Sequence, residues 1–470
     1  MNPGSLILPA LRWREDGDFA HEQPVIDAAL GFGAGGFILF GGTEASVRKL
    51  TAELRASAGR PLLIASDLER GAGQQVRGLA ELPTPLALAA LDDLAVVRGA
   101  GALTAAQAHS VGINWVFAPV ADLDLEPDNP IVQTRAFGDD PARVATLVAQ
   151  WIIGCEALGA LSCAKHWPGH GRTRTDSHDM LPVVDAPADL LRRSDMLPFR
   201  AAVEAGVSSI MTAHVAYPSL DPTGAPATRS EPILSILREE LGFHGPIVSD
   251  AMIMEGALGG RSEAEAAREA VRAGIDLLLY PTDPPAVARA LDAAAGHDQV
   301  FRARIDASLA RYEAVLRRAP DGPTVADGDS GSAAAAADWL LALPLLRGTA
   351  PRLRMPLELV LVDDDQGGRW PAVPPDHVAE VLRAGGVTLG PGGSRIVLGF
   401  ASPRASKGRA GFGPESLARL AASRDADLVV LFGHPRLGAE LPGASPVVLA
   451  WHRQRLMQAA AARWLSGRII

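Results

Sequence analysis

The sequence lacks several features that mark particular classes of protein. Its 470 residues include only two cysteines, Cys155 and Cys163, which argues against a disulfide framework and fits a reducing compartment. No apolar run approaches the roughly 18 residues that cross a bilayer, so we expect no membrane partner. A basic excess is also missing. The net charge of -10 disfavours a nucleic-acid partner, because such binders usually carry a basic surface.

The N-terminal residues, MNPGSLILPALRWRED, have no basic stretch ahead of their apolar run, and Pro9 interrupts that run. This pattern does not match a secretory signal, and we expect a cytoplasmic protein. With 48% hydrophobic and 21% charged residues, the composition is that of an ordinary globular protein. A single core tends to stop growing near about 250 to 300 residues, so the length predicts two domains.

Short apolar runs alternate with helical patterns from residue 5 to about residue 320, which predicts repeated strand–helix units and a parallel sheet. Segments such as 45–59 and 190–206 have apolar positions three or four apart, as covering helices do. Several strands end in polar chemistry, as in IASDLE, CAKH, MTAHV and IVSDAM. These features predict an α/β fold with a (β/α)8 TIM-type barrel whose active site lies at the C-terminal ends of the strands. The predicted strands are 5–11, 35–42, 61–69, 114–125, 161–166, 208–215, 246–252 and 276–282.

A stretch rich in Gly, Pro, Ser, Asp and Ala follows the predicted barrel. We therefore predict a catalytic barrel domain over 1–320, a linker over 321–350, and a small α/β sandwich domain over 351–470. The second domain has no comparable cluster of chemical groups. Its predicted strands are 357–365, 394–401, 426–435 and 445–452.

The segment KHWPGHGRTRTDSH, residues 165–178, holds three of the eleven histidines and allows three interpretations. It can be a polar turn, in which His and Asp satisfy loop hydrogen bonds. It can be a metal site, because His166, His170, Asp176 and His178 are all possible zinc ligands. However, the spacing is not HExxH, and no second cluster accompanies it. The third interpretation is a catalytic loop.

In the catalytic interpretation, Lys165 and His166 end a barrel strand and donate hydrogen bonds to a polar substrate. Glycines at 169 and 171 allow the following residues to move as a lid that carries His178. Asp176 lies two residues before His178, near enough to orient the imidazole. Such a pair can act first as general acid and then as general base. We expect His170 to hold the loop rather than the substrate.

The loop needs a partner, and Asp250 at the end of the strand 246–252 supplies one. A buried carboxylate at a strand end is costly unless it is paired or used. It could cap the next helix or close an ion pair. Taken together with the histidine-rich loop, Asp250 is interpreted as a nucleophile. A carboxylate nucleophile opposite an acid/base group is typical of a retaining glycosidase.

These residues resemble glycoside hydrolase family 3, and within it the bacterial β-N-acetylglucosaminidases of peptidoglycan recycling. The family pattern K-H-[FW]-P-G-H-G-x4-D-S-H is matched throughout 165–178, and SDAM is matched at 249–252. TRAFGDDP (134–141), IMTAHVAYPSLD (210–221) and PATRS (226–230) are similar as well. The resemblance covers residues 5–320.

The resemblance implies a retaining exo-β-N-acetylglucosaminidase that acts on cell-wall muropeptides or chito-oligosaccharides without metal or cofactor. Asp250 is then the nucleophile, and Asp176 with His178 the acid/base dyad. The family's sugar-binding positions are carried over to Asp67, Arg77, Arg135, Lys165 and His166. Arg77 is a substitute, because this chain reads DLERGAGQQVRG where relatives have D-x-E-G-G-x-V-x-R.

Arg172 stands where relatives often have a small or acidic residue, and with Arg70 it would favour an anionic aglycone. Three alternatives stay open: a phosphorylase that transfers the sugar to phosphate, a zinc-dependent barrel hydrolase, and a catalytically inactive sugar-binding protein. The sequence does not indicate an oligomeric state.

Overall fold

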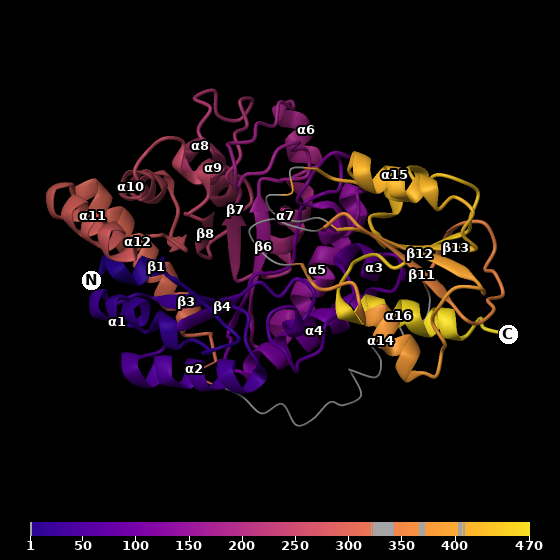
Figure 1. Ribbon diagram of the computed structural model, residues 1–470. Coiled ribbons are helices and arrows are strands. Elements are labelled where there is room, and N and C mark those ends of the chain that lie inside the picture. The colour runs from indigo at the N-terminus through magenta and orange to yellow at the C-terminus, as the bar shows by residue number, and fades with distance from the viewer. Residues whose placement is uncertain (1, 321, 323–342, 366–371, 403–406, 408) are drawn as a thin grey trace. The chain divides into compact units, whose positions relative to one another are not determined.

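The computed structural model describes residues 2–320, 322, 343–365, 372–402, 407 and 409–470. The chain divides into two compact units (Figure 1). The first comprises Met1–Glu81, Asp92–Glu126 and Ala136–Asp329, and the second comprises Leu82–Leu91, Pro127–Arg135 and Ser330–Ile470. Two short segments from within the predicted barrel domain therefore group with the C-terminal part of the chain.

The first unit is built on one parallel sheet with the order β1-β9-β8-β7-β6-β5-β4-β3-β2. β1 pairs with β9 and β2 pairs with β3, and only Pro9 separates β1 from β2. The sheet therefore returns to its own first strand, which confirms the predicted barrel and all eight of its strands. The strands are β1 (Ile7–Leu8), β2 (Ala10–Arg12), β3 (Gly36–Phe40), β4 (Leu63–Ser66), β5 (Trp115–Val116), β6 (Leu161–Trp167), β7 (Ser209–Thr212), β8 (Ile247–Ala251) and β9 (Leu277–Leu279).

Helices connect these strands and cover the barrel. α2 (Glu44–Ala58) illustrates why they form where they do: Thr43 and Ser46 make a reciprocal capping box at its start, and Gly59 ends it in a left-handed conformation. Its buried residues include Val47, Leu50 and Leu54, three or four positions apart. The other helices are α1 (Gln23–Phe32), α4 (Leu94–Ser110), α5 (Pro141–Ala157), α6 (Ala188–Arg193), α7 (Leu197–Glu204), α8 (Glu231–Ser235), α9 (Glu255–Leu258), α10 (Glu263–Ala273), α11 (Pro284–His297) and α12 (Gln299–Leu316).

Two predicted elements differ from the structure in detail. The helical pattern over 190–206 is split into α6 and α7, and Pro198 is the second residue of α7, in the first turn, where a missing N–H costs nothing. The predicted strand 114–125 is regular only over Trp115–Val116. The chain beyond still runs beside β6, where Ala121 donates its N–H to the carbonyl of Lys165. Pro119 has no N–H to give, which shortens the ladder.

The second unit contains a five-stranded sheet of order β10-β14-β13-β12-β11, in which only β10 is antiparallel. In Figure 1, α15 lies on one side of this sheet and α14 and α16 on the other. The four predicted strands are confirmed, and β10 places three residues of the predicted linker in this sheet. The elements are α3 (Pro85–Ala89), β10 (Leu345–Arg347), β11 (Glu358–Asp363), α14 (His377–Ala384), β12 (Arg395–Ala401), α15 (Pro414–Ala422), β13 (Leu428–Gly433), β14 (Val447–Leu449) and α16 (Arg455–Ser466).

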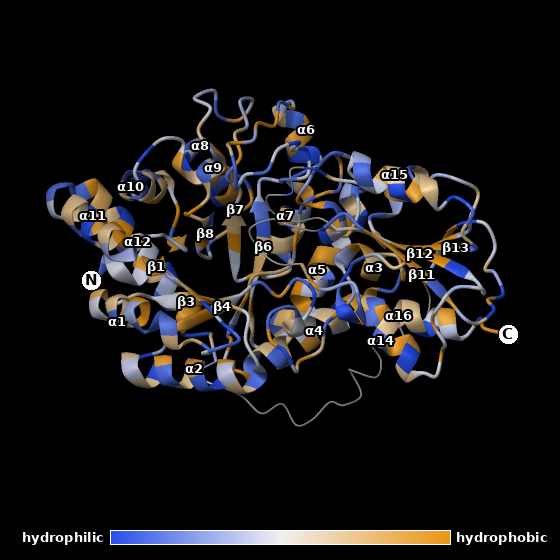
Figure 2. Ribbon diagram, viewed as in Figure 1, coloured by the Kyte–Doolittle hydropathy of each residue, from blue (hydrophilic) through white to orange (hydrophobic). Residues whose placement is uncertain are grey.

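The distribution of hydrophobic and hydrophilic residues agrees with this arrangement of helices and sheets. Figure 2 shows hydrophobic and hydrophilic residues side by side on the helices, as expected for elements with one face on a core. Both cysteines are buried, Cys155 in α5 and Cys163 in β6. Among the described residues, no helix combines the length and the apolar character needed to cross a membrane.

A buried carboxylate joins the strands at the N-terminal end of the barrel. Asp276, which precedes β9, is fully buried and accepts the backbone N–H of Ile247 at 2.9 Å. It also accepts hydrogen bonds from Arg238 at 2.5 Å and Arg304 at 2.6 Å, and Arg311 lies at 3.2 Å. Without this carboxylate, three arginines would face one another in a partly buried space.

We therefore expect Asp276→Ala to lower the free energy of unfolding by about 3–5 kcal/mol, because it leaves buried cations unpaired. Denaturant unfolding measures the change. Asp292→Ala, which removes an exposed aspartate on α11, is the matched control and should stay within about 0.5 kcal/mol of the parent protein. Equal effects for the two variants would contradict this role of Asp276.

Candidate active site

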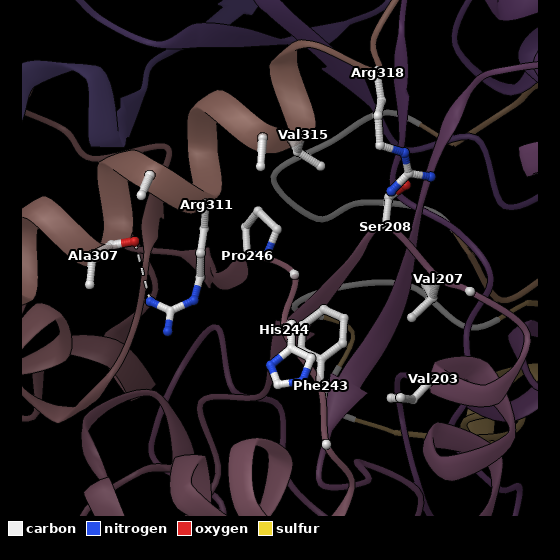
Figure 3. A pocket seen from close by; sticks show the side chains of 15 residues that line it. Val203, Val207, Ser208, Phe243, His244, Pro246, Ala307, Arg311, Val315 and Arg318 are labelled. Atoms are coloured by element: carbon white, nitrogen blue, oxygen red, sulfur yellow. Dashed lines mark hydrogen bonds between the residues drawn. The ribbon is translucent and has the colours of Figure 1, made fainter.

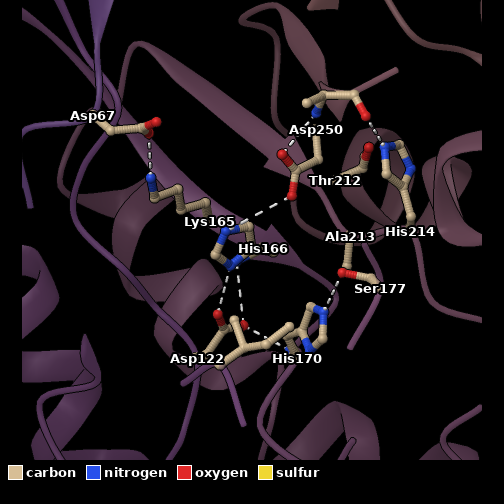
Figure 4. A network of polar contacts seen from close by, with 12 residues as sticks. Asp67, Asp122, Lys165, His166, His170, Ser177, Thr212, Ala213, His214 and Asp250 are labelled. Carbon is tan, nitrogen blue, oxygen red and sulfur yellow. Dashed lines mark hydrogen bonds and ion pairs between the residues drawn. The ribbon is translucent and has the colours of Figure 1, made fainter. Parts of the chain in front are cut away.

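Four of the predicted site residues meet at the C-terminal end of the barrel (Figure 4). Asp67 follows β4, Lys165 and His166 lie near the end of β6, and Asp250 lies near the end of β8. Because parallel barrel strands all present their carboxyl ends to the same face, residues almost two hundred positions apart reach one site.

Lys165 forms the first part of this site. Its side chain is only 3% exposed, and its Nζ lies 2.7 Å from Asp67 Oδ1 and 2.8 Å from Glu69 Oε1. A buried ammonium needs such compensation. Glu69 is buried as well, whereas Asp67 keeps 28% of its side chain exposed. Asp67 is therefore the carboxylate of this group with more surface available to a ligand. Glu69 was not predicted as a site residue, although it stands in the same DLE motif as Asp67.

His166 links two carboxylates. Its Nδ1 lies 2.7 Å from Asp122 Oδ2, and its Nε2 lies 4.0 Å from Asp250 Oδ2. Asp122 also accepts the backbone N–H groups of His166 at 3.2 Å and His170 at 2.6 Å. Burial would raise the pKa of Asp122, but the charge of His166 and its hydrogen bond outweigh burial and lower that pKa. Asp122 was not predicted, and the only available signal was its place in VADLDL after an apolar run.

Asp250 is held as an anion. Its own backbone neighbour, Ala251, donates an N–H to Oδ1 at 2.7 Å, and 21% of the side chain is exposed. Burial alone would raise the pKa of Asp250, but the charges of His166 and then His214 lower it to about 2. His178 acts in the same direction. His214 is fixed in turn, because its Nδ1 contacts Thr228 Oγ1 at 2.8 Å and its Nε2 contacts the Ala251 carbonyl at 3.1 Å.

Asp176 and His178 are in direct contact in the loop after β6. The imidazole Nδ1 lies 2.7 Å from Asp176 Oδ1, and the same oxygen accepts the backbone N–H of His178 at 2.9 Å. Asp176 is 2% exposed and His178 is 40% exposed. If Nδ1 carries the proton toward Asp176, Nε2 of the exposed ring is left for proton exchange with a ligand. This arrangement suits an acid/base group.

The rest of the loop is held by packing. Gly169 has φ +135°, and a Cβ on Gly171 would lie 1.8 Å from the carbonyl oxygen of Leu123. The glycine at 171 is therefore required by close backbone packing, and its predicted part in a mobile lid stays a prediction. Arg172 was predicted to favour an anionic aglycone. Its Nε lies 2.9 Å from Oδ1 and 3.0 Å from Oδ2 of Asp195.

The two predicted sugar-binding arginines contact partners of their own. The Arg77 side chain is 62% exposed, pairs with Glu15 at 2.9 Å and lies over the Trp13 ring at 4.7 Å. It is thus engaged with surface residues rather than with the Asp67–Lys165 pair. Arg135 ends a short helix, Gln133–Arg135, that belongs to the second compact unit, and its Nη1 donates to the Ile131 carbonyl at 3.3 Å. Its role in the site stays a prediction.

The histidines that suggested zinc face different partners. His166 lies between Asp122 and Asp250, and His170 contacts Thr173 Oγ1 at 2.7 Å and Ser177 Oγ at 3.2 Å. Over the part of the chain that the structure describes, no group of three or more His, Cys, Asp or Glu side chains is arranged to hold a metal ion.

A separate cavity of about 670 Å³ lies near the N-terminal ends of β7 and β8, away from these groups (Figure 3). It is lined largely by apolar side chains together with His244, Arg311 and Arg318. Arg311 pairs with Asp276 at 3.2 Å and Arg318 with Glu156 at 2.8 Å. No carboxylate lines this cavity, so it contains no counterpart of Asp250.

This chain is similar to several known proteins. Residues 32–315 match the family model described as the glycosyl hydrolase family 3 N-terminal domain. The chain is 36% identical over 260 residues to a protein of Nitrosomonas eutropha named beta-hexosaminidase, a match that covers 53% of this chain and 74% of the relative.

A protein of Cellulomonas fimi named beta-N-acetylglucosaminidase/beta-glucosidase is 34% identical over 260 residues. That match covers 53% of this chain and spans less than half, 46%, of the relative. The solved structure of a glycoside hydrolase family 3 β-N-acetylglucosaminidase from Paenibacillus sp. str. FPU-7 superposes with a TM-score of 0.83 at 27% identity. The superposition covers 100% of this chain and 96% of the Paenibacillus chain.

The buried His170 makes stability depend on pH. Burial, the largest cause, lowers the pKa of His170 from 6.5 to about 4. Between these values the unfolded chain binds a proton that the folded chain does not. The stability that His170 contributes is therefore complete above pH 6.5 and is lost as the pH falls toward 4.

We expect His170 alone to account for a loss of about 3 kcal/mol between neutral pH and pH 4, as its shift implies. Denaturant unfolding at both pH values tests this in the parent protein and in His170→Gln, which cannot titrate. The variant should lose distinctly less stability on acidification. An equal loss in both proteins would contradict the assignment.

Proposed function

The chain belongs to glycosyl hydrolase family 3, and we propose that this glycoside hydrolase is a retaining exo-β-N-acetylglucosaminidase with Asp250 as nucleophile and His178 as acid/base group. The observation that carries the proposal is the pairing of an ionised carboxylate, with a pKa near 2, and an exposed imidazole that is oriented by a buried aspartate. Relatives named beta-hexosaminidase support the choice of sugar.

The reaction proceeds in two steps. The Asp250 carboxylate attacks the anomeric carbon, and His178 donates a proton to the departing oxygen. This forms a glycosyl–enzyme ester with inverted configuration. His178, now neutral, removes a proton from water as the water attacks the same carbon, which releases the sugar with its original configuration. Asp176 keeps the imidazole oriented through both steps.

An imidazole suits this site better than a second carboxylate would. Two carboxylates at close range oppose each other's ionisation, whereas a neutral or cationic ring leaves Asp250 charged. Lys165 and Asp67 provide a donor and an acceptor for sugar hydroxyls, and His166 a further contact, as a buried polar ligand requires. We propose that the natural substrates are muropeptides or chito-oligosaccharides in the cytoplasm.

Asp250→Ala should lower turnover of an aryl β-N-acetylglucosaminide by about a thousandfold or more, because the nucleophile is lost. Asp292→Ala serves again as the surface control. His178→Ala should instead accumulate a covalent adduct on an activated aryl substrate, since its second step lacks a base. Mass spectrometry of the intact protein detects the adduct. Unchanged turnover in Asp250→Ala would sink the nucleophile assignment, and an inactive parent protein would favour a sugar-binding role.

A panel of aryl glycosides tests the substrate and the acceptor together. We expect the N-acetylglucosaminide to be cleaved faster than the glucoside or xyloside, with free N-acetylglucosamine as product whether or not phosphate is present. A sugar 1-phosphate as main product would make the protein a phosphorylase instead. Stoichiometric zinc in the purified protein, with loss of activity on chelation, would favour the zinc hydrolase.

A further inference from the structure

Ser177 lies between the two members of the acid/base dyad and is itself only 2% exposed. Its hydroxyl Oγ lies 3.2 Å from His170 Nε2, and its carbonyl oxygen accepts the backbone N–H of Gly256 at 3.2 Å. Gly256 belongs to α9, which follows the strand that carries Asp250. We call this set of three residues, His170, Ser177 and Gly256, the Ser177 clamp.

Both ends of the clamp are anchored to the site. His170 donates its backbone N–H to Asp122 at 2.6 Å, the same carboxylate that holds His166 (Figure 4). At the other end, a Cβ on Gly256 would lie 3.0 Å from the carbonyl oxygens of both Ser177 and His214. The loop is therefore confined between the segment that holds the sugar contact His166 and the segment after the nucleophile.

The hydrogen bonds define the direction of the Ser177 contact. Thr173 Oγ1 lies 3.0 Å from the His170 carbonyl, to which it donates its only proton. The His170 Nδ1–H then donates to Thr173 Oγ1 at 2.7 Å, which leaves Nε2 as an acceptor for the Ser177 hydroxyl. Burial lowers the pKa of His170 to about 4, so the ring is neutral and keeps this acceptor at neutral pH.

We propose that Ser177 is a positioning residue: by joining His170 and Gly256 it fixes the Asp176–His178 dyad where His178 can protonate the leaving group of a substrate bound at Asp250. This inference rests on the proposed function. The His178 ring is 40% exposed and is held by Asp176, so the backbone on either side of Ser177 positions both members of the dyad. A displacement of about 1 Å in a catalytic group can cost a hundredfold in rate.

Loss of acid positioning can be told from general destabilisation by how the rate depends on the leaving group. Proton donation matters most for poor leaving groups and little for acidic phenols, which depart as anions. The experiment therefore measures kcat/KM, which reports the first chemical step, for the phenyl, nitrophenyl and dinitrophenyl β-N-acetylglucosaminides. The full-length variants are Ser177→Ala, Ser177→Thr, His170→Asn, His170→Gln and His178→Ala, and each is checked by thermal unfolding.

Ser177→Ala should lower kcat/KM about tenfold for the phenyl glycoside and less than about twofold for the dinitrophenyl glycoside. His170→Asn keeps a donor near Nδ1 but loses the acceptor near Nε2, and should give the same pattern. His170→Gln can place its amide oxygen near the former Nε2, and Ser177→Thr keeps the hydroxyl, so both should stay closer to the parent. Ser219→Ala is the matched control: it removes one hydroxyl–carbonyl hydrogen bond of 2.6 Å, to Ala186, outside the clamp.

The outcomes separate this inference from the proposed function. His178→Ala should show the steepest dependence on the leaving group, and if it shows none, the acid/base assignment fails. If His178→Ala behaves as expected while Ser177→Ala and His170→Asn lose activity equally on all three substrates, or lose none, the clamp is overturned and the dyad stands.

Discussion

The site depends on the contact between Asp122 and His166. A fully buried carboxylate accepts one imidazole N–H and two backbone N–H groups, and this fixes both the ring and the chain that leads into the dyad loop. Because the buried anion must be compensated, the ring is held with its Nδ1 toward Asp122 and its Nε2 toward Asp250. One buried charge thus orients His166, the proposed sugar contact, whose charge in turn lowers the pKa of Asp250, the proposed nucleophile.

Positive and negative side chains alternate at the C-terminal end of the barrel. Lys165 lies between Asp67 and Glu69, and Asp250 has His166 on one side and is close enough to His214 for that ring to lower its pKa. Each buried group has a partner of opposite sign, which limits the cost of desolvation. The same arrangement lowers the pKa of Asp250 to about 2, so this carboxylate is an anion at neutral pH.

The dyad loop combines close packing with one exposed reactive ring. Gly171 packs against Leu123, Arg172 is paired with Asp195, and Ser177 is tied to two neighbouring segments. The His178 side chain is 40% exposed. These contacts hold the loop backbone and, through it, His178. The contacting segments themselves carry other residues of the candidate site. The proposed sugar contact His166 and the proposed acid/base group His178 therefore depend on the same local packing.

Strand–helix alternation was enough to predict the barrel and its eight strands, because the period of apolar residues records which face is buried. The order of motifs along the chain likewise indicated Asp250, Lys165, His166 and the Asp176–His178 pair, since strand ends in a barrel share one face. The sequence could not indicate Glu69, Asp122 or Ser177 as part of the site. Their roles arise from contacts between loops far apart in the chain, such as Ser177 with Gly256, and local pattern carries no information on such distances. For the same reason the sequence could not show that Arg77 pairs with Glu15, and its predicted sugar contact stays a prediction. Which charge a long arginine side chain meets is decided only when the loops pack.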